Sequence, residues 1–361
     1  MLKRHAHVLV AAALTAAGAH GGPPRFSAIA LPQSANTFGP SFVQGVTSTG
    51  AVLGSGNRIW RSGSVEQIAT GSAFTGIAIS ESGVVVGGTA TPRHAAFWSE
   101  GELSPLESGA ERSFAAGVSN DGSIIAGSVG RSPSVWNDGQ RLVTALDTPY
   151  TEGVFQGVGN DGTAVGRALY PATDIPELNQ SHGIIQHDGH ISYIESVPGA
   201  TSIEQRWIEV TATNSSGHSV GAASDLSLAV NALGTAFEVV DGQIDTLSKI
   251  QDTSHTAARD INDNGWIVGT SYNQTTDTRF ATLWLGGVAY NLNDLLSTTL
   301  GDLQVSSAHA VSNSGHIVVT VQGAGATGFL GGVSYLLTPI PAPSSTMCIA
   351  LAIGACSRRR R

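Results

Sequence analysis

A glycine-centred turn that recurs seven times constrains this chain more than any other feature. Its glycines follow one another at intervals of 33 to 55 residues. Most of them come directly after Asn, Asp or Ser, which favour tight turns. Repeats of this length are typical of solenoids and propellers. The seven turn glycines are Gly50, Gly83, Gly122, Gly162, Gly217, Gly265 and Gly315.

Each turn glycine is followed by the same series of features. A second glycine comes four or five residues later in six copies, and the last copy has Val319 there. A large apolar residue follows and then another glycine turn. The second glycines are Gly54, Gly87, Gly127, Gly166, Gly221 and Gly269. The large apolar residues are Trp60, Trp98, Trp136, Ile185, Phe237, Trp284 and Phe329, and the last copy ends in a turn at Gly332.

The second copy shows the unit that this pattern predicts. Residues 74–80, 84–89, 94–99 and 102–106 are rich in strand-forming residues and are separated by turns. Alternation in the first of these strands puts Ile77 and Ile79 on one face. Four antiparallel strands of this kind make one propeller blade. We therefore expect an all-β fold: a seven-bladed β-propeller of four-stranded antiparallel blades over residues 25–340, with an open β-solenoid as the alternative.

A strand-like segment at residues 26–31 precedes the first copy. It is available to pair with the last blade and close the ring, although the last copy looks complete without it. In a closed ring the tryptophans would fill the spaces between neighbouring sheets.

Several copies carry the same short motifs. Asn120-Asp121-Gly122 with Gly127, Asn160-Asp161-Gly162 with Gly166, and Ile261 to Gly265 with Gly269 are the clearest. With Ala95 to Trp98 and Gly101, they resemble the HAF family of probable extracellular repeats over residues 42–340. The triplet that names the family appears as His94-Ala95-Ala96-Phe97, with one residue inserted. The resemblance implies a propeller-like surface protein without catalytic residues.

The N-terminus predicts export. Lys3 and Arg4 precede an apolar run at residues 8–17, which ends on Ala17-Gly18-Ala19. A basic region, an apolar region and small residues at a cleavage site make a secretory signal peptide, here residues 1–19. The two cysteines, Cys348 and Cys356, lie near the C-terminus, so the repeats hold no disulfide.

The C-terminal tail, residues 341–361, has three parts. A proline-rich stretch precedes a short apolar run at residues 347–355, and four arginines end the chain. The tail resembles the PEP-CTERM sorting signal, although Ala342 stands where that family has glutamate. The resemblance implies an exosortase-type processing enzyme as a partner, transient membrane contact, and delivery to the cell surface or matrix. An uncleaved tail, acting as a membrane anchor, is the alternative. The matching residues are Pro341, Pro343, Ser344, Arg358, Arg359, Arg360 and Arg361.

Charge and motifs exclude several functions. The formal net charge is −9, and six of the 18 basic residues lie at the two ends, so the repeats are strongly acidic. Such a body repels phosphate backbones, and we expect no nucleic-acid partner. No phosphate-binding loop, dinucleotide fingerprint or catalytic elbow occurs, so no catalytic residue, cofactor or metal site is predicted.

Two short segments resemble metal sites in part. Residues 260–265 have the first oxygen ligands and the glycine of a calcium loop, but Ser271 stands where the bidentate glutamate is needed. His182, His187 and His190 cluster near Asp188; treated as one strand, the first and last of these histidines share a face. We interpret the first segment as a plain turn and the second as a solvated loop.

Two longer inserts, residues 168–181 and 199–207, indicate where specificity would lie, since propellers carry binding residues on loops at one rim. Tyr170, Trp207 and Tyr272 are candidate contacts, with ordinary packing as the alternative.

The chain is thus predicted to be an exported, non-catalytic surface or extracellular-matrix protein that binds a polymer or another protein. The alternative is a propeller enzyme, a lyase or hydrolase acting on extracellular polysaccharide. That enzyme would require polar residues converging on the axis from several blades.

Overall fold

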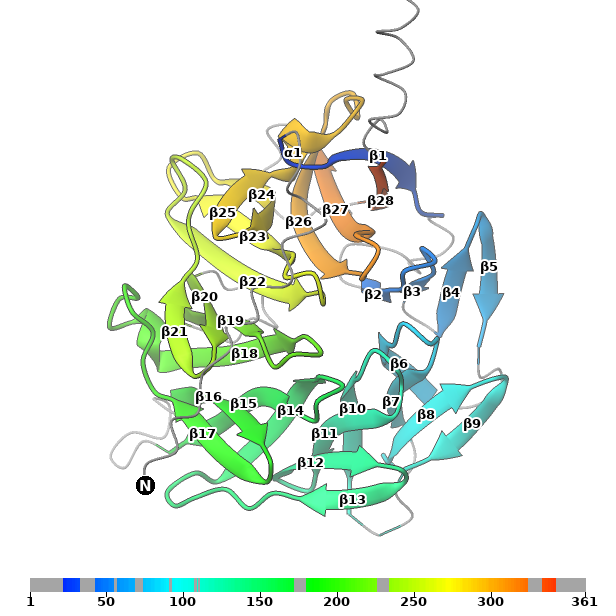
Figure 1. Cartoon of the computed structure of the whole chain (residues 1–361), viewed down its shortest axis with the longest axis vertical. Coiled ribbons are helices and arrows are strands. Elements are labelled where there is room, and N and C mark those ends of the chain that lie inside the picture. Colours follow the sequence, from blue (N-terminus) through cyan, green and yellow to red (C-terminus); the bar gives the residue numbers. More distant parts are fainter. Residues whose placement is uncertain are drawn as a thin grey trace, which may run out of the picture.

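Seven blades of four antiparallel strands surround a central axis in the computed structural model of this chain (Figure 1). Five blades are separate sheets, and the fourth and fifth are joined into one eight-stranded sheet by a single parallel bridge between Ser181 and Trp207. The fold is a seven-bladed β-propeller, as the repeats predict. The structure describes residues 22–32, 43–54, 57–68, 74–90, 93–106, 109, 111–171, 180–225, 234–323 and 333–341.

The blades follow one another along the chain, and each begins with its innermost strand. Blade 1 has β2 (Val43–Val46), β3 (Val52–Gly54), β4 (Arg58–Arg61) and β5 (Ser64–Gln67). Blade 2 has β6 (Phe74–Ile79), β7 (Val85–Thr89), β8 (Ala95–Ser99) and β9 (Glu102–Pro105). Blade 3 has β10 (Ser113–Val118), β11 (Ile124–Val129), β12 (Ser132–Asn137) and β13 (Gln140–Val143). Blade 4 has β14 (Glu152–Val158), β15 (Ala164–Tyr170), β16 (Gln180–His187) and β17 (His190–Ile194).

The remaining blades have the same order. A 3-10 helix, η3 (Glu204–Arg206), leads into blade 5, which has β18 (Trp207–Thr213), β19 (Ser219–Ser224), β20 (Thr235–Val240) and β21 (Gln243–Thr246). Blade 6 has β22 (His255–Ile261), β23 (Ile267–Asn273), β24 (Thr278–Leu285) and β25 (Val288–Asn291), followed by the short helix α1 (Leu292–Leu295). Blade 7 has β26 (Leu303–Val311), β27 (Ile317–Gly323) and β28 (Ser334–Ile340).

Blade 7 takes its fourth and outermost strand from the other end of the chain. β1 (Arg25–Ala30) pairs antiparallel with β28, in a register that sets Phe26 opposite Pro339 and Ala30 opposite Tyr335. The predicted pairing of segment 26–31 is therefore confirmed, and it closes the ring, which excludes the open solenoid. The expectation that the last copy is complete in itself is wrong, because β28 is its third strand and β1 its fourth. Phe329 and Gly332 lie outside the described residues.

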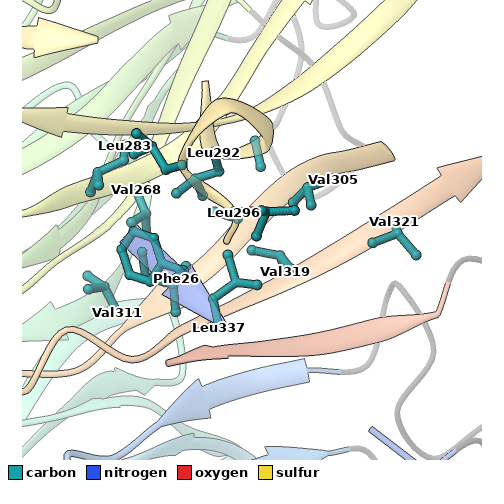
Figure 2. Close-up of a cluster of buried hydrophobic side chains, with 14 residues drawn as sticks. Phe26, Val268, Leu283, Leu292, Leu296, Val305, Val311, Val319, Val321 and Leu337 are labelled. Atoms are coloured by element: carbon teal, nitrogen blue, oxygen red, sulfur yellow. The ribbon is translucent and has the colours of Figure 1, made fainter. Parts of the chain in front are cut away.

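The core consists of apolar clusters between neighbouring blades. Phe26 is fully buried beside Val268 of β23 and Leu337 of β28, so the closing strand is anchored by an aromatic ring (Figure 2). Trp136 and Trp284 are equally buried in their own clusters. Burying a side chain of this size contributes roughly 1.5–3 kcal/mol. The tryptophans fill the spaces between sheets, as predicted.

The innermost strand of every blade carries a β-bulge. The pairing register of each shifts by one residue near its middle. The extra residue lies six positions before the turn glycine in every copy. Alternation therefore fails in β6: Ile79 packs into a core cluster, whereas Ile77 is the bulged residue. We call the seven bulged residues the bulge ring: Gln44, Ile77, Ala116, Gln156, Thr211, Arg259 and His309.

The bulge explains the second glycine of the repeat. A Cβ atom on Gly127 would lie 1.9 Å from the carbonyl oxygen of Phe114, because the bulge brings that carbonyl against the facing strand. Gly87, Gly166, Gly221 and Gly269 meet carbonyl oxygens at 1.9 or 2.0 Å in the same way. Blade 7 has Val319 at this position, and its inner strand carries a second register shift, between Val305 and Ser307.

The described part of the chain contains no helix that is long and apolar enough to span a membrane. The predicted signal peptide (1–19) lies outside the described residues, as does the predicted tail except for Pro341.

Candidate functional site: the axial pocket

The innermost strands of all seven blades enclose a pocket of about 210 Å³ on the propeller axis. Every member of the bulge ring lines it. The bulge turns these side chains to the axis, since Ile77 and Ala116 belong to none of the buried clusters between blades. Gln44, Gln156 and Arg259 are half-buried, so solvent reaches the pocket.

The bulge ring is polar on one side and apolar on the other. Arg259, His309 and Gln44 come from the consecutive blades 6, 7 and 1, and they form a polar arc. Ile77 and Ala116, from blades 2 and 3, form an apolar arc. The repeat pattern does not reveal these residues, because their side chains differ from copy to copy. Their constant spacing from the turn glycine was the signal that could have found them.

Side chains from the turns close one end of the pocket, where Glu81, Asn120 and Asn313 line it. The Asn120 amide of blade 3 donates to the Asp263 carboxylate of blade 6 over 2.9 Å, and to Ser215 of blade 5 over 3.3 Å. Blades 3 and 6 lie on opposite sides of the ring, so the bond from Asn120 to Asp263 crosses the axis (Figure 1). The members of this turn ring all stand two residues before a turn glycine: Ser48, Glu81, Asn120, Asn160, Ser215, Asp263 and Asn313.

Side chains of the turn ring also form hydrogen bonds between several neighbouring blades. Asp263 accepts a hydrogen bond from the backbone N–H of Ser215, and Asn313 accepts one from the backbone N–H of Asp263, both over 2.8 Å. Glu81 accepts from the backbone N–H groups of Ser48 and Asn313. Positive φ values in these turns occur at the glycines. The Asn and Asp residues of the turn ring therefore also link blades to one another.

Arg259 is the cation of the pocket, and its Nε atom is buried without a hydrogen-bond partner among the described residues. Burial is the main cause that lowers the pKa of its guanidinium, and the positive charge of Arg279 lowers it further, whereas Glu209 raises it. Glu209 is 3% exposed and already has two partners. Arg167 Nε lies 2.9 Å from its carboxylate, and the indole Nε1 of Trp207 donates to it over 2.8 Å.

Two further ionisable groups line the pocket with shifted pKa values. Burial raises the pKa of Asp260 to about 7, although its oxygens accept hydrogen bonds from the backbone N–H groups of Ile261 and Val311. Burial and the neighbouring Arg259 lower the pKa of His309 to about 3, so its imidazole is neutral at pH 7. The His309 Nε2 atom lies 3.3 Å from Thr320 Oγ1.

The three predicted rim residues lie near the blade ends opposite the turn ring, in separate surroundings. Tyr170 packs edge-on against Tyr150. The Arg167 guanidinium carbon lies 5.0 Å from the centre of the Trp207 ring. The indole of Trp207 also donates to Glu209, which places it close to the charged groups around Arg259. Tyr272 donates its hydroxyl to Asp277 over 2.9 Å. The structure does not bring the three together.

The two segments that resemble metal sites make turn and cross-strand contacts within the protein. Asn262 Oδ1 caps its own turn by accepting from the backbone of Asn264 and Trp266, so the oxygens of segment 260–265 face protein donors. His187 and His190 are cross-strand partners on one face, which corrects their expected placement on opposite faces. Within the described ranges, no three His, Cys, Asp or Glu residues form a group that could hold a metal ion.

No protein-family model matches the chain, and no curated protein matches it. Among solved structures, the crystal structure of TolB from Acinetobacter baumannii is similar at 11% sequence identity and a TM-score of 0.35. The match covers 72% of this chain and 64% of the TolB chain, which is less than two thirds of its length. The propeller assignment therefore rests on the seven blades themselves, and the resemblance to HAF repeats stays a prediction.

Proposed function

We propose that this protein is an exported, non-catalytic binding protein of the cell surface or extracellular matrix, and that it takes its ligand in the axial pocket. The observation that supports this most is the polar arc. Arg259, His309 and Gln44 converge from three blades on a solvent-reached pocket. Within it, a buried guanidinium nitrogen has no partner among the described residues. Buried donors are nearly always satisfied by protein or by water, and a ligand that enters the pocket would bring an acceptor to this nitrogen in place of water.

The chemistry of the pocket favours binding over catalysis. A general acid or base works best when its pKa lies near the working pH and when it reaches the substrate. His309, with a pKa of about 3, is a weak base at neutral pH. Asp260 has a suitable pKa, but both carboxylate oxygens face backbone N–H groups. The polar axis nevertheless meets one requirement of a polysaccharide lyase or hydrolase, which is the alternative function.

The cellular location of the protein is proposed from its N-terminal and C-terminal segments. The basic, apolar and small-residue order of residues 1–19 supports export. The PEP-CTERM-like tail and the HAF-like repeats support a surface or matrix location, with an exosortase-type enzyme as processing partner. Extracellular polysaccharide or a surface protein would then be the binding partner.

Blocking the pocket tests this function. Ala116→Phe places a ring on the axis without removing a polar group, and Ala145→Phe makes the same change at an exposed position. We expect the first variant to lose binding to matrix polysaccharide from the native host while the second retains it. No new reducing ends or unsaturated products should form with the wild type. Turnover would contradict the proposal, as would full binding by Ala116→Phe.

A further inference from the structure

The guanidinium of Arg259 shares a carboxylate with another arginine. Glu209 is the carboxylate whose charge stabilises the Arg259 cation, but Glu209 also pairs with Arg167. The positive charge of Arg279 acts on Arg259 in the opposite direction. The other carboxylates that line the pocket, Asp260 and Glu81, accept hydrogen bonds from backbone N–H groups. A buried guanidinium is stabilised by a carboxylate partner that can accept its N–H groups. A bound anionic group would supply that partner.

The rest of the polar arc and Gln156, which lines the pocket from blade 4, suit hydroxyl groups. The side-chain amides of Gln44 and Gln156 make no hydrogen bonds to other described residues, and each can both donate and accept. His309 is neutral and its Nε2 atom faces Thr320, so its other ring nitrogen is left to donate to a ligand or to accept from it. Hydroxyl groups are likewise both donors and acceptors. The arc therefore matches a ligand that carries one carboxylate and several hydroxyl groups.

The apolar arc and the size of the pocket limit the ligand further. Ile77 and Ala116 offer a C–H surface opposite the polar arc, which is suited to packing against the face of a sugar ring. At about 210 Å³ the pocket is smaller than the roughly 300–1,000 Å³ of sites for drug-sized ligands. Its floor is crossed by the bond from Asn120 to Asp263, so a polymer cannot thread through. One unit at a chain end fits this geometry.

We infer that the axial pocket recognises the terminal uronate of an otherwise neutral polysaccharide, with its carboxylate on Arg259 and its hydroxyls on Gln44, Gln156 and His309. This inference rests on the proposed binding function and specifies its ligand. An acidic peptide side chain would satisfy Arg259, but it brings no hydroxyls for the amides. We therefore favour the sugar.

Calorimetric titration of the full chain tests the inference, with a glucuronate-terminated trisaccharide as the probe. The matched comparison is the same trisaccharide ending in glucose. We expect the uronate to bind at least tenfold more tightly, since a hydrogen bond to a charged group contributes roughly 1.5–3 kcal/mol. Arg259→Gln should remove this preference. Arg112→Gln, the same change at an exposed arginine, should preserve it.

Gln44→Leu serves as a second variant if Arg259→Gln fails to fold. Its amide makes no hydrogen bond to described residues, so we expect unchanged thermal stability and severalfold weaker binding of both sugars. Equal affinity for the two trisaccharides, no binding of either, or tighter binding of a glutamate-rich peptide would overturn the uronate assignment. Conversion of the trisaccharide into products would instead overturn the non-catalytic function while leaving uronate recognition intact.

Discussion

The Asn120 amide donates to the Asp263 carboxylate over 2.9 Å, and this bond joins blades 3 and 6 across the propeller axis. Asp263 also accepts from the side-chain amide of Asn313 over 2.7 Å and from the backbone N–H of Ser215, so four blades meet at one carboxylate. The turn ring thus forms the floor of the pocket and also joins opposite blades by a hydrogen bond. We call this cross-axis hydrogen bond the clasp.

Substitutions at Asn120 should weaken this clasp. Asn120→Ala removes the side-chain amide that donates to Asp263 and to Ser215. The free energy of unfolding, measured with urea, should fall by about 1–2 kcal/mol. Asn120→Asp places a second negative charge against Asp263, and we expect a larger loss that is reduced by added salt. Asn137→Ala, at an exposed position, is the control and should change the stability by less than about 0.5 kcal/mol. Equal effects of all three would contradict the clasp.

The second glycine of the repeat should tolerate no side chain. A Cβ at Gly127 would meet the carbonyl oxygen of Phe114 at 1.9 Å, and backbone must move to relieve the contact. We expect Gly127→Ala to cost about 3 kcal/mol or more, measured by thermal and urea unfolding. Gly109→Ala meets nothing within 4 Å and should be close to neutral. A neutral Gly127→Ala would mean that the bulge in β10 is absent.

The repeat pattern predicted the blades because the backbone constraints that it records recur in every copy. The glycines mark the turns and the bulges, and the tryptophans mark the spaces between sheets. The pocket could not be predicted in this way, because Arg259, His309 and Gln44 share a position but no chemistry. A pattern search detects residues that recur, whereas a binding site is built from those that differ.

The repeat pattern also did not predict which strand completes the last blade. The sequence indicated that segment 26–31 is a strand, but the apolar residues near Phe329 suggested that the last copy could supply its own four strands. The structure instead pairs β1 with β28, because Phe26 completes the cluster that contains Leu337 and Val268. That choice depends on contacts between residues about 240 to 310 positions apart, which local patterns do not record.

The packing of Phe26 predicts how strongly the closing strand is held. Phe26→Ala empties a fully buried site and should lower the free energy of unfolding by about 3–5 kcal/mol. Ile29→Ala, on the same strand but 46% exposed, should cost less than about 1 kcal/mol. Urea unfolding of both variants measures the difference. Similar costs at the two positions would show that β1 is not packed against blade 7.

Stability should depend on pH through two opposed groups in the pocket. The Asp260 pKa is raised to about 7 from about 3.9 in an unfolded chain, so its contribution to stability is greatest at low pH and is lost as the pH rises through 7. The His309 pKa is lowered to about 3 from about 6.5, so its contribution is lost as the pH falls below about 6.5. Between about pH 4 and 6.5 the two slopes offset each other.

Two variants separate these slopes. Relative to the wild type, His309→Gln should gain stability as the pH falls from 6.5 to 4, by up to about 1.4 kcal/mol per pH unit. Asp260→Asn should lose stability over the same range. Urea unfolding at several pH values gives both slopes, and groups elsewhere contribute equally to each protein. Parallel pH profiles for all three proteins would show that neither group is buried in the folded state.

The axial pocket exists only if β1 closes the ring, and one disulfide tests that closure most directly. Ser27 and Thr338 are partners in the register of β1 and β28. With Cys348 and Cys356 changed to serine, the double variant Ser27→Cys and Thr338→Cys should form one intramolecular disulfide and melt at a higher temperature. The pair Ser27→Cys and Ser64→Cys, in strands that do not pair, should stay reduced. Free thiols or disulfide-linked dimers from the first pair would contradict the closed ring.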